Sequence, residues 1–319
     1  MQQARFHRLA GGSIMLKKFM ILLTSLSLVV GVALVAPSAH RPDAVPRYEP
    51  VANWPQLPPG SKFGDMTAVA TDAADRVYVF HRGKQPIMVF DKNGKFLRSW
   101  GDDLIDTAHG LRIDRAGNIW ITDIGTHLVT KFDAEGKVLL TLGKKGQPGE
   151  GRDQFNEPTD VAVAASGEFY VSDGYGNSRV VKFAKDGKYL KEWGKKGTGE
   201  GEFDLPHTIC LDRKGQVYVG VRENDRVQVF DTEGKFLAQW KECGAPYGLF
   251  PTSEGMLLAD GRANVVKVLD LQGKVLRRWG EKGKGAGQFE LAHWVCVDSQ
   301  GAVYVAEGEG QRVQKFVAK

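Results

Sequence analysis

The sequence has few cysteines and none of the common catalytic motifs. Its 319 residues include three cysteines, Cys210, Cys243 and Cys296. We expect these to be small buried core residues, with a catalytic thiol as the alternative. There is no Gly-x-Ser-x-Gly elbow, no Cys-x-x-Cys pair and no His-Glu-x-x-His motif, which excludes the familiar signatures of serine hydrolases, thiol oxidoreductases and zinc proteases. The glycine-rich stretches, such as WGKKGTGEGEFD, lack the Gly-Lys-Ser/Thr of a phosphate-binding loop.

The chain also lacks a surplus of either charge once its N-terminus is set aside. The formal charge is +5, but four of the 43 Lys and Arg residues lie within 1–39, which hold no Asp or Glu. The remainder therefore has 39 basic and 38 acidic residues. No basic stripe is left that would indicate binding to nucleic acid.

The long apolar run of the chain lies near its N-terminus. Lys17 and Lys18 precede an apolar stretch over 19–36, which is followed by Pro37, Ser38 and Ala39. This order is typical of a signal peptide over 1–39, so we expect an exported protein, periplasmic or extracellular. The stretch is also long enough to span a bilayer, and an uncleaved membrane anchor through 19–36 is the alternative.

An internal repeat accounts for the rest of the sequence. Each complete copy holds four short apolar runs, rich in Val, Ile, Tyr and Phe, which are separated by Asp-x-x-Gly and Glu-Gly-Lys turns. A repeat unit of four short strands predicts a β-propeller blade. Six copies predict an all-β, six-bladed propeller over residues 61–319. The copies cover 62–100, 108–142, 155–193, 203–240, 245–279 and 289–316.

The last copy has three of its four runs, and a segment before the first copy has the spacing of the missing one. Copy 289–316 ends without the outer FLxxWG run, whereas RYEPVANWP at 47–55 has a matching hydrophobic spacing. We expect residues 40–60 to form a linker and the strand that closes the ring, because closure removes exposed sheet edges. We expect the propeller to be a monomer.

Three histidines recur at one register of the repeat, in alternate copies. Each lies five residues before the aspartate that ends an inner run. In a six-bladed ring their side chains would point at the axis about a third of a turn apart. Three neutral imidazoles with an open position suit Zn²⁺, and other transition metals fit the same ligands. Taken singly, each is typical of a satisfied core or rim histidine. The equivalent positions in the six copies are Thr67, His109, Thr159, His207, Tyr247 and His293.

The loops between the second and third runs should open on the same face as these histidines. They carry Arg82, Tyr175, Arg222 and Arg262, which would surround a metal with cations and a phenol, an arrangement that suits an anionic ligand. We interpret Tyr175 as a general base whose phenolic pKa is lowered by arginine and metal. The alternative is a rim aromatic.

Two other assignments stay open on spacing alone. Arg222 would either contact a substrate or pair with Glu223 or Asp225 on the surface. His81 and His127 fall in loops on the same face but outside the register. We expect supporting or structural roles for them.

Several segments closely resemble one enzyme family. They are IWITDIGTHLVTKF at 119–132, EPTDVAVAASGEFYVSDGYGNSRVVKF at 157–183, LPHTICL at 205–211 and VRENDRVQVF at 221–230. The blades resemble NHL repeats. The segments resemble peptidyl-α-hydroxyglycine α-amidating lyase, and the similarity covers most of residues 60–316.

The resemblance implies a six-bladed propeller with a zinc ion held by three histidines, which fall on His109, His207 and His293. It implies a catalytic tyrosine and two substrate-binding arginines, which fall on Tyr175, Arg82 and Arg222. The implied reaction cleaves the C–N bond of a peptidyl-α-hydroxyglycine and releases an amidated peptide and glyoxylate. The expected substrate is a peptide or small molecule with an α-hydroxyglycine-like end, including other α-hydroxy-amide or ureido compounds.

The chain departs from the family at three places. Trp294 stands where the family has an aspartate that helps to hold a structural calcium, which argues against that calcium here. Leu291 replaces a methionine two residues before the third histidine. The family's disulfide cysteines are replaced by Asn156, Gly176, Tyr218 and Val229. Two hypotheses follow: an exported zinc-dependent lyase, or a non-catalytic NHL-repeat propeller that binds a peptide or protein.

Overall fold

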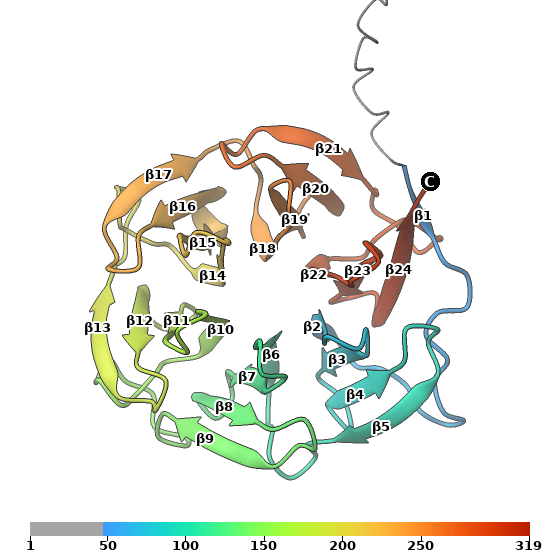
Figure 1. The fold of residues 1–319 in the computed structure, drawn as a ribbon, viewed down its shortest axis with the longest axis horizontal. Helices are drawn as coiled ribbons and strands as arrows, with labels where there is room; N and C mark the ends of the chain where they lie inside the picture. The colour runs from blue at the N-terminus through green and yellow to red at the C-terminus, as the bar shows by residue number, and fades with distance from the viewer. Residues whose placement is uncertain (1–46) are drawn as a thin grey trace, which may run out of the picture. The chain divides into compact units, whose positions relative to one another are not determined.

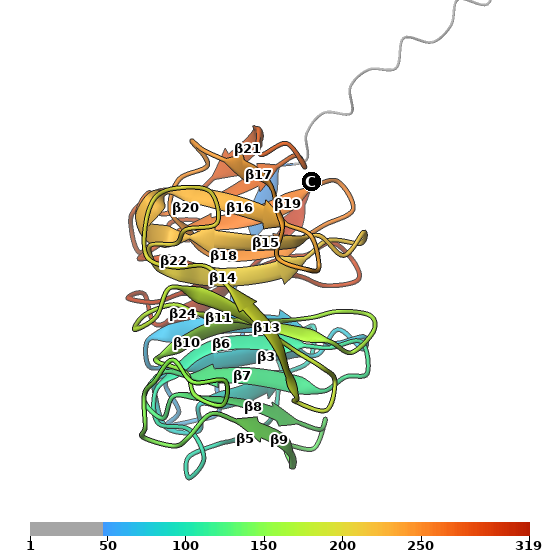
Figure 2. The ribbon, with the colours of Figure 1, turned by 90° about the vertical axis from the view of Figure 1, so that its left-hand side faces the viewer.

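Six four-stranded antiparallel sheets surround a central axis in the computed structural model, which describes residues 47–319 (Figure 1). This confirms the predicted six-bladed all-β propeller. Figure 2 views the same ring from the side. In five of the blades, four strands follow one another in the chain from the axis outward. Within residues 47–319 there is no helix long and apolar enough to cross a membrane. The expected signal or anchor segment lies outside this range.

The blades are numbered in chain order, and their strands run from the axis outward. Blades 1 and 2 comprise β2 (Met66–Thr71), β3 (Val77–His81), β4 (Ile87–Phe90), β5 (Phe96–Trp100), then β6 (Ala108–Ile113), β7 (Ile119–Asp123), β8 (Leu128–Phe132) and β9 (Val138–Leu142). Blades 3 and 4 comprise β10 (Pro158–Val163), β11 (Phe169–Asp173), β12 (Arg179–Phe183), β13 (Tyr189–Trp193), then β14 (Pro206–Leu211), β15 (Val217–Val221), β16 (Arg226–Phe230) and β17 (Phe236–Trp240). Blades 5 and 6 comprise β18 (Pro246–Pro251), β19 (Met256–Asp260), β20 (Val265–Leu269), β21 (Val275–Trp279), then β22 (Ala292–Val297), β23 (Val303–Glu307), β24 (Arg312–Ala318) and β1 (Tyr48–Pro50).

The sixth blade takes its outer strand from the other end of the described chain. β1 pairs antiparallel with β24, with Tyr48 opposite Ala318 and Pro50 opposite Phe316. The backbone N–H of Lys319 also donates to the carbonyl oxygen of Arg47. The ring is closed by this pairing between the first and last strands.

Each inner strand has a β-bulge at the position that is equivalent to the three histidines. Pairing between the first and second strands of each blade shifts across one residue, or across two in blade 2. A bulge of this kind leaves a residue unpaired and re-aims its side chain. The side chains at this position of the six inner strands therefore do not follow the normal alternation of a strand, and they form a ring around the axis. The skipped residues are Thr67, His109 with Gly110, Thr159, His207, Tyr247 and His293.

The aspartates that follow the three histidines build turns. The carboxylate of Asp114 accepts hydrogen bonds from the backbone N–H groups of Ala116 and Asn118 and from the indole N–H of Trp120. Asp212 and Asp298 accept in the same way, each with a tyrosine hydroxyl as the aromatic partner. These carboxylates fix the turn between the first and second strands of the blade.

The three cysteines are buried and free, as the core interpretation expects. Burial raises the pKa of Cys210 to about 12 and that of Cys243 to about 11. A thiol is a nucleophile only as its thiolate, so these groups are inert near neutral pH. The catalytic-thiol alternative is therefore not supported.

Candidate metal centre

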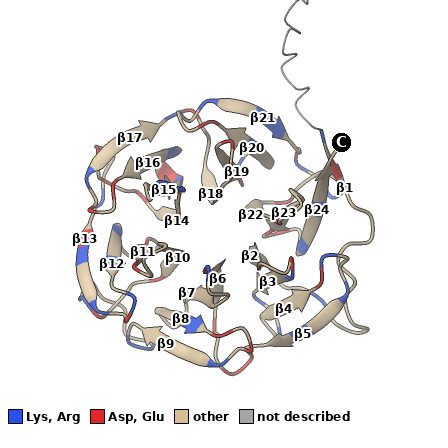
Figure 3. Cartoon of the chain, in the orientation of Figure 1, with Lys and Arg blue, Asp and Glu red and all other residues tan. Residues whose placement is uncertain are grey.

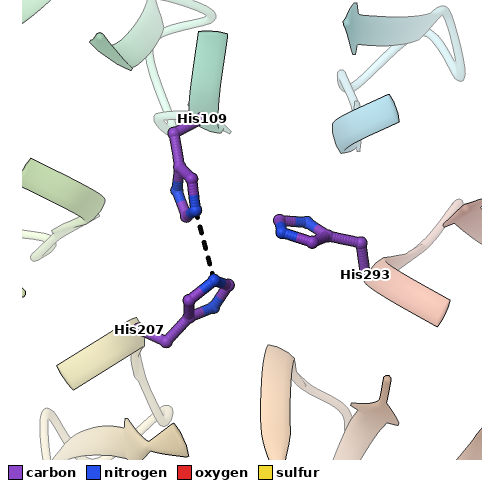
Figure 4. A group of neighbouring side chains, drawn as sticks. All are labelled: His109, His207 and His293. Carbon is purple, nitrogen blue, oxygen red and sulfur yellow. Dashed lines mark hydrogen bonds between the residues drawn. The ribbon is translucent and has the colours of Figure 1, made fainter. Parts of the chain in front are cut away.

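The three register histidines meet at the axis (Figure 4). His109, His207 and His293 come from blades 2, 4 and 6, and their ligand nitrogens all lie within 4.8 Å of one another. His109 and His207 are fully buried, and His293 is 6% exposed. Within residues 47–319 this is the one group of three or more His, Cys, Asp or Glu side chains that could hold a metal ion.

Each histidine is oriented by the backbone of the following blade. The Nδ1 atoms of His109, His207 and His293 lie 2.6, 2.7 and 2.7 Å from the carbonyl oxygens of Thr159, Tyr247 and Thr67. A carbonyl oxygen only accepts, so each Nδ1 must carry the proton, which leaves the Nε2 lone pair free for the centre. Metal-ligating histidines are usually fixed by such a second hydrogen bond.

The contact between His109 and His207 favours a bound cation. Their Nε2 atoms are 3.2 Å apart, and in the tautomer fixed by the carbonyls both atoms present lone pairs. A positive charge between two such lone pairs removes their repulsion. The donor set therefore fits a metal ion with three nitrogen ligands and an open position, as in catalytic zinc sites.

The protonation state of the imidazoles also fits a metal. Burial lowers the pKa of His109 and His207 well below the usual value, and the neighbouring histidines and Arg222 push in the same direction. Burial lowers the pKa of His293 to about 4. The three rings are neutral at pH 7, which is the form that binds metals.

Tyr175 stands over two of the histidines. Its hydroxyl oxygen lies 3.2 Å from the Nε2 atoms of both His109 and His207 and 3.3 Å from Nη1 of Arg222. The β11–β12 loop that carries it is pressed against the start of β14: a Cβ on Gly174 would lie 2.1 Å from the carbonyl oxygen of Pro206. Glycine at 174 is thus what lets Tyr175 reach the axis.

In the metal-free protein the pKa of Tyr175 is set mainly by burial, and the predicted lowering by arginine and metal together stays a prediction. Burial raises this pKa above the usual value, whereas Arg222 and Arg82 act in the expected, lowering direction. Desolvation of the phenolate outweighs the two arginines. In the protein by itself Tyr175 is therefore a neutral phenol at pH 7.

The two open interpretations of Arg222 prove compatible. Its Nε donates to Glu223 at 2.8 Å, and its Nη1 faces the hydroxyl of Tyr175. Arg222 lies in a short 3₁₀ helix, η1 (Arg222–Asn224), and its side chain is 16% exposed. The acid holds one edge of the guanidinium and leaves the other edge for the centre.

The prediction that Arg262 lies beside the histidines is wrong. Its guanidinium pairs with Glu223 and, at 2.8 Å, with Asp225, and its side chain is 43% exposed. The acidic side chains of the β15–β16 connection attract it more strongly than the electropositive centre does. Arg82 does lie beside the centre: its Nε donates at 3.1 Å to the carbonyl oxygen of Ala108, next to His109.

Two cavities are each lined by one residue near the centre, the first by Tyr175 and the second by Arg82. One of about 580 Å³ is lined by Tyr175, Lys196 and Asp204, between blades 3 and 4. The other, of about 640 Å³, is lined by Arg82 together with Lys62 and Lys84. Both volumes suit small-molecule or short-peptide ligands.

Tyr247 is a site residue that the sequence interpretation did not single out. Its ring lies 5.2 Å from that of His207 and 5.6 Å from that of His293, between centroids. The guanidinium carbon of Arg222 lies 5.1 Å from the centroid of Tyr247 and 5.4 Å from that of Tyr175. Its place in the six-fold register was the signal that marked it.

His81 and His127 have structural roles, as expected. Nδ1 of His81 accepts from the backbone N–H of Gly64, and Nδ1 of His127 accepts from that of Glu157, both at 3.1 Å. His81 is buried against Phe63, and burial lowers its pKa to about 4. Neither belongs to the metal-binding group.

The residues around Trp294 do not fit a calcium site. Calcium takes oxygen ligands, but the indole of Trp294 is fully buried and offers none. The guanidinium of Arg112 already covers this ring, with its carbon 4.6 Å from the centroid. The face of this ring is thus covered by a cationic side chain of the protein itself.

Comparisons with known proteins identify a repeat family and several relatives. The model of the NHL repeat matches residues 155–183. Peptidyl-α-hydroxyglycine α-amidating lyase 2 of Drosophila melanogaster is 35% identical over 213 residues, which cover 57% of this chain and 51% of that protein. The chain is similar to amidating lyases. The family resemblance seen in the sequence is thereby confirmed.

Two further relatives show the range of this similarity. Peptidyl-glycine alpha-amidating monooxygenase B of Xenopus laevis is 36% identical over 206 residues, covering 54% of this chain and 23% of that protein. NHL repeat-containing protein 3 of Mus musculus is 37% identical over 177 residues, covering 51% of each. The chain spans about half the length of these relatives, or less.

Solved structures share the fold at low sequence identity. A streptogramin B lyase has a TM-score of 0.63 at 14% identity, covering 86% of this chain and 98% of that one. A gluconolactonase from Xanthomonas campestris has a TM-score of 0.61 at 15% identity, covering 81% and 87%. These matches support the propeller architecture.

Proposed function

We propose that this chain is a metal-dependent lyase that cleaves the C–N bond of an α-hydroxyglycine-like amide, giving the free amide and glyoxylate. The observation that carries the proposal is the position of the Tyr175 hydroxyl. It lies 3.2 Å from the nitrogens of two imidazoles and 3.3 Å from an arginine. Metal ligands, a proton-transfer group and a cation for an anionic substrate therefore converge on one point.

The reaction requires little of the protein beyond position and proton transfer. The substrate, R–CO–NH–CH(OH)–COO⁻, loses the hydroxyl proton as its C–O bond becomes a carbonyl. The C–N bond electrons pass to nitrogen, which takes up a proton to give R–CO–NH₂. The fragments, amide and glyoxylate, contain all the atoms of the substrate. The reaction consumes neither water nor an oxidant.

The residues divide these tasks. His109, His207 and His293 would hold zinc, which supplies Lewis acidity toward a substrate oxygen. Tyr175 is placed to exchange the hydroxyl proton, since its oxygen already faces that point. Arg222, through the edge that Glu223 leaves free, would hold the carboxylate, and Arg82 would assist from the opposite blade.

Glyoxylate release tests the proposal. Purified protein, loaded with zinc, is incubated with a peptide that ends in α-hydroxyglycine, and glyoxylate is measured over time. We expect turnover that the His207→Ala variant lacks. Equal glyoxylate release from both proteins would reject this substrate, and α-hydroxy-amide and ureido analogues can then be tried in the same assay.

The second candidate is a non-catalytic propeller that binds a peptide or protein. The similarity to NHL repeat-containing protein 3, whose name states no reaction, favours it. Metal content separates the two candidates. Stoichiometric metal that is lost in His109→Ala supports the lyase, whereas a protein without bound metal or zinc affinity supports the scaffold.

We also propose that the protein is exported as a monomer, through a signal over 1–39 or with a membrane anchor through 19–36. The charge asymmetry and apolar run of that segment support export. N-terminal sequencing of protein from the producing cell, together with its membrane or soluble fractionation, distinguishes cleavage from anchoring. Light scattering of the purified protein gives the oligomeric state.

A further inference from the structure

The inner strands carry one buried ion pair. Arg112 on β6 and Asp160 on β10 are the only charged residues on the six inner strands β2, β6, β10, β14, β18 and β22. The other charges of the described blades lie on the second, third and fourth strands and on the loops (Figure 3). The side chain of Asp160 is fully buried, and that of Arg112 is 13% exposed. Buried charges are costly unless they are paired and hydrogen-bonded, so this pair needs a reason.

The guanidinium of Arg112 is bonded across the middle of the ring. Nε and Nη2 donate to the two carboxylate oxygens of Asp160 at 3.0 and 2.6 Å. Nη2 also faces Thr208 Oγ1 and the Ile209 carbonyl oxygen at 3.2 and 3.3 Å. Nη1 donates to the carbonyl oxygen of Leu249 at 3.1 Å. The last contact reaches blade 5, which lies opposite blade 2.

Trp294 completes this set from blade 6. Its ring lies 4.6 Å from the guanidinium carbon of Arg112, 6.5 Å from the centroid of His109 and 6.2 Å from that of His293. One arginine therefore contacts inner strands of blades 3, 4, 5 and 6 while it belongs to blade 2. The indole is thus a neighbour both of the guanidinium and of two of the three imidazoles.

Two of the three histidines directly precede a residue of this cluster, and the third is hydrogen-bonded to the residue before Asp160. Thr208 directly follows His207, and Trp294 directly follows His293. Asp160 follows Thr159, whose carbonyl oxygen holds Nδ1 of His109. The carboxylate of Asp160 also accepts from the hydroxyl of Thr208 and the backbone N–H of Ile209. Any movement of the cluster would move the histidine backbones.

We propose that the Arg112 guanidinium is a built-in cation at the axis, which takes the place of a bound ion and, with Asp160 and Trp294, sets the spacing of the three histidines. Arg112 is thus a positioning residue that touches no substrate. The proposal rests on the metal-binding part of the proposed function. It does not depend on the lyase reaction.

Calcium gives the first test. Thermal unfolding of metal-depleted and of zinc-loaded protein is measured with and without millimolar CaCl₂. A built-in cation leaves no role for the added ion, so Tm should not change. A ligand that binds the native state stabilises it, so a rise in Tm with calcium would show that the axis still binds an ion. That result would overturn the proposal that Arg112 takes the place of the ion.

Cobalt binding gives the second test, because the visible spectrum of Co²⁺ reports the geometry of its ligands. The variants are Arg112→Met and, as a matched control, Arg226→Met. Arg226 is also buried and bonded to several carbonyl oxygens, but these belong to residues 198–202, which adjoin no histidine of the centre. Both variants should lose stability. Only Arg112→Met should bind cobalt about 10- to 100-fold more weakly, with an altered spectrum.

An Arg112→Met protein with the cobalt affinity and spectrum of the parent would refute the positioning role. Should that variant fail to fold, Arg112→Lys retains the charge and loses the two-pronged contact with Asp160. It should bind cobalt with intermediate affinity, and parent-like affinity would refute the role equally. A parent chain that binds no cobalt would overturn the proposed metal centre and the positioning role together. The calcium experiment would still test whether Arg112 takes the place of a bound ion.

Discussion

The Nδ1 atom of His207 lies 2.7 Å from the carbonyl oxygen of Tyr247, and the ring of the same tyrosine lies 5.2 Å from the imidazole. Tyr247 thus orients one histidine of the candidate metal centre through its backbone. It reaches Arg222 through its side chain, at 5.1 Å from the guanidinium carbon. Because the backbone contact survives a change of side chain, mutation separates these two roles.

Tyr247→Leu should weaken substrate binding without loss of metal. The variant removes one of the two aromatic faces that hold Arg222, and a cation–π contact contributes about 0.5–2 kcal/mol. We expect KM to rise several-fold, up to about thirtyfold, with bound zinc unchanged. Steady-state kinetics and metal analysis measure both quantities. Zinc loss in this variant would show that the ring, rather than the carbonyl, supports His207.

Tyr175→Phe should keep the fold and the metal but lose turnover. The ring still packs against the imidazoles, whereas the hydroxyl that we propose exchanges the substrate proton is gone. A positioned acid or base contributes about 10²- to 10⁴-fold, so kcat should fall by that factor. Tyr170→Phe is the control, because that hydroxyl bonds the Thr232 carbonyl oxygen, away from the centre. An unchanged rate in Tyr175→Phe would make the phenol a rim residue.

Arg222→Ala and Arg262→Ala should differ sharply, although both arginines pair with Glu223. Loss of Arg222 removes the guanidinium edge that faces Tyr175, so KM should rise and kcat should fall by about tenfold or more. Loss of Arg262 breaks exposed ion pairs that contribute little, about 0–1 kcal/mol. Activity should then stay within about threefold of the parent. Equal losses in the two variants would place the substrate contact elsewhere.

The stability of the metal-free protein should fall as the pH drops from about 6.5 to 4. Unfolded histidine binds a proton below pH 6.5, but His81 in the folded protein stays neutral until about pH 4. Between these pH values the unfolded protein binds a proton that the folded protein does not. Each unit by which the pH falls therefore lowers the unfolding free energy by about 1.4 kcal/mol for such a group.

His81→Gln tests this pH dependence. Its unfolding free energy, from urea titrations at pH 7 and pH 5, should depend less on pH than that of the parent, by about 2 kcal/mol over the interval. The residual slope comes from the histidines of the metal centre, which are also buried. A slope equal to that of the parent would mean that His81 does not contribute.

The strands and the histidine register could be predicted because they depend on local pattern. Alternation of apolar residues and Asp-x-x-Gly turns defined the six blades, and the spacing of residues 47–55 indicated the strand that became β1. The identical offset of His109, His207 and His293 predicted that they meet, and the bulges now explain how their side chains leave the strand alternation.

What the sequence did not predict depends on partners far apart in the chain. The sequence interpretation did not single out Arg112, because its hydrogen-bond partners lie 48 to 137 residues away. Arg262 was misplaced because the attraction of Glu223 and Asp225 depends on the path of a neighbouring loop. The pKa of Tyr175 depends on burial, which no spacing of residues gives.

The pairing of β1 with β24 has a consequence for the order of assembly. Tyr48–Pro50 are among the first residues of the ring to be synthesised, yet their partner strand is the last. Five blades can form as the chain emerges, while the sixth must wait for both ends. Since the backbones of Arg47 and Lys319 already touch, a chain that joins these ends through a short linker and opens between two other blades should fold into the same ring.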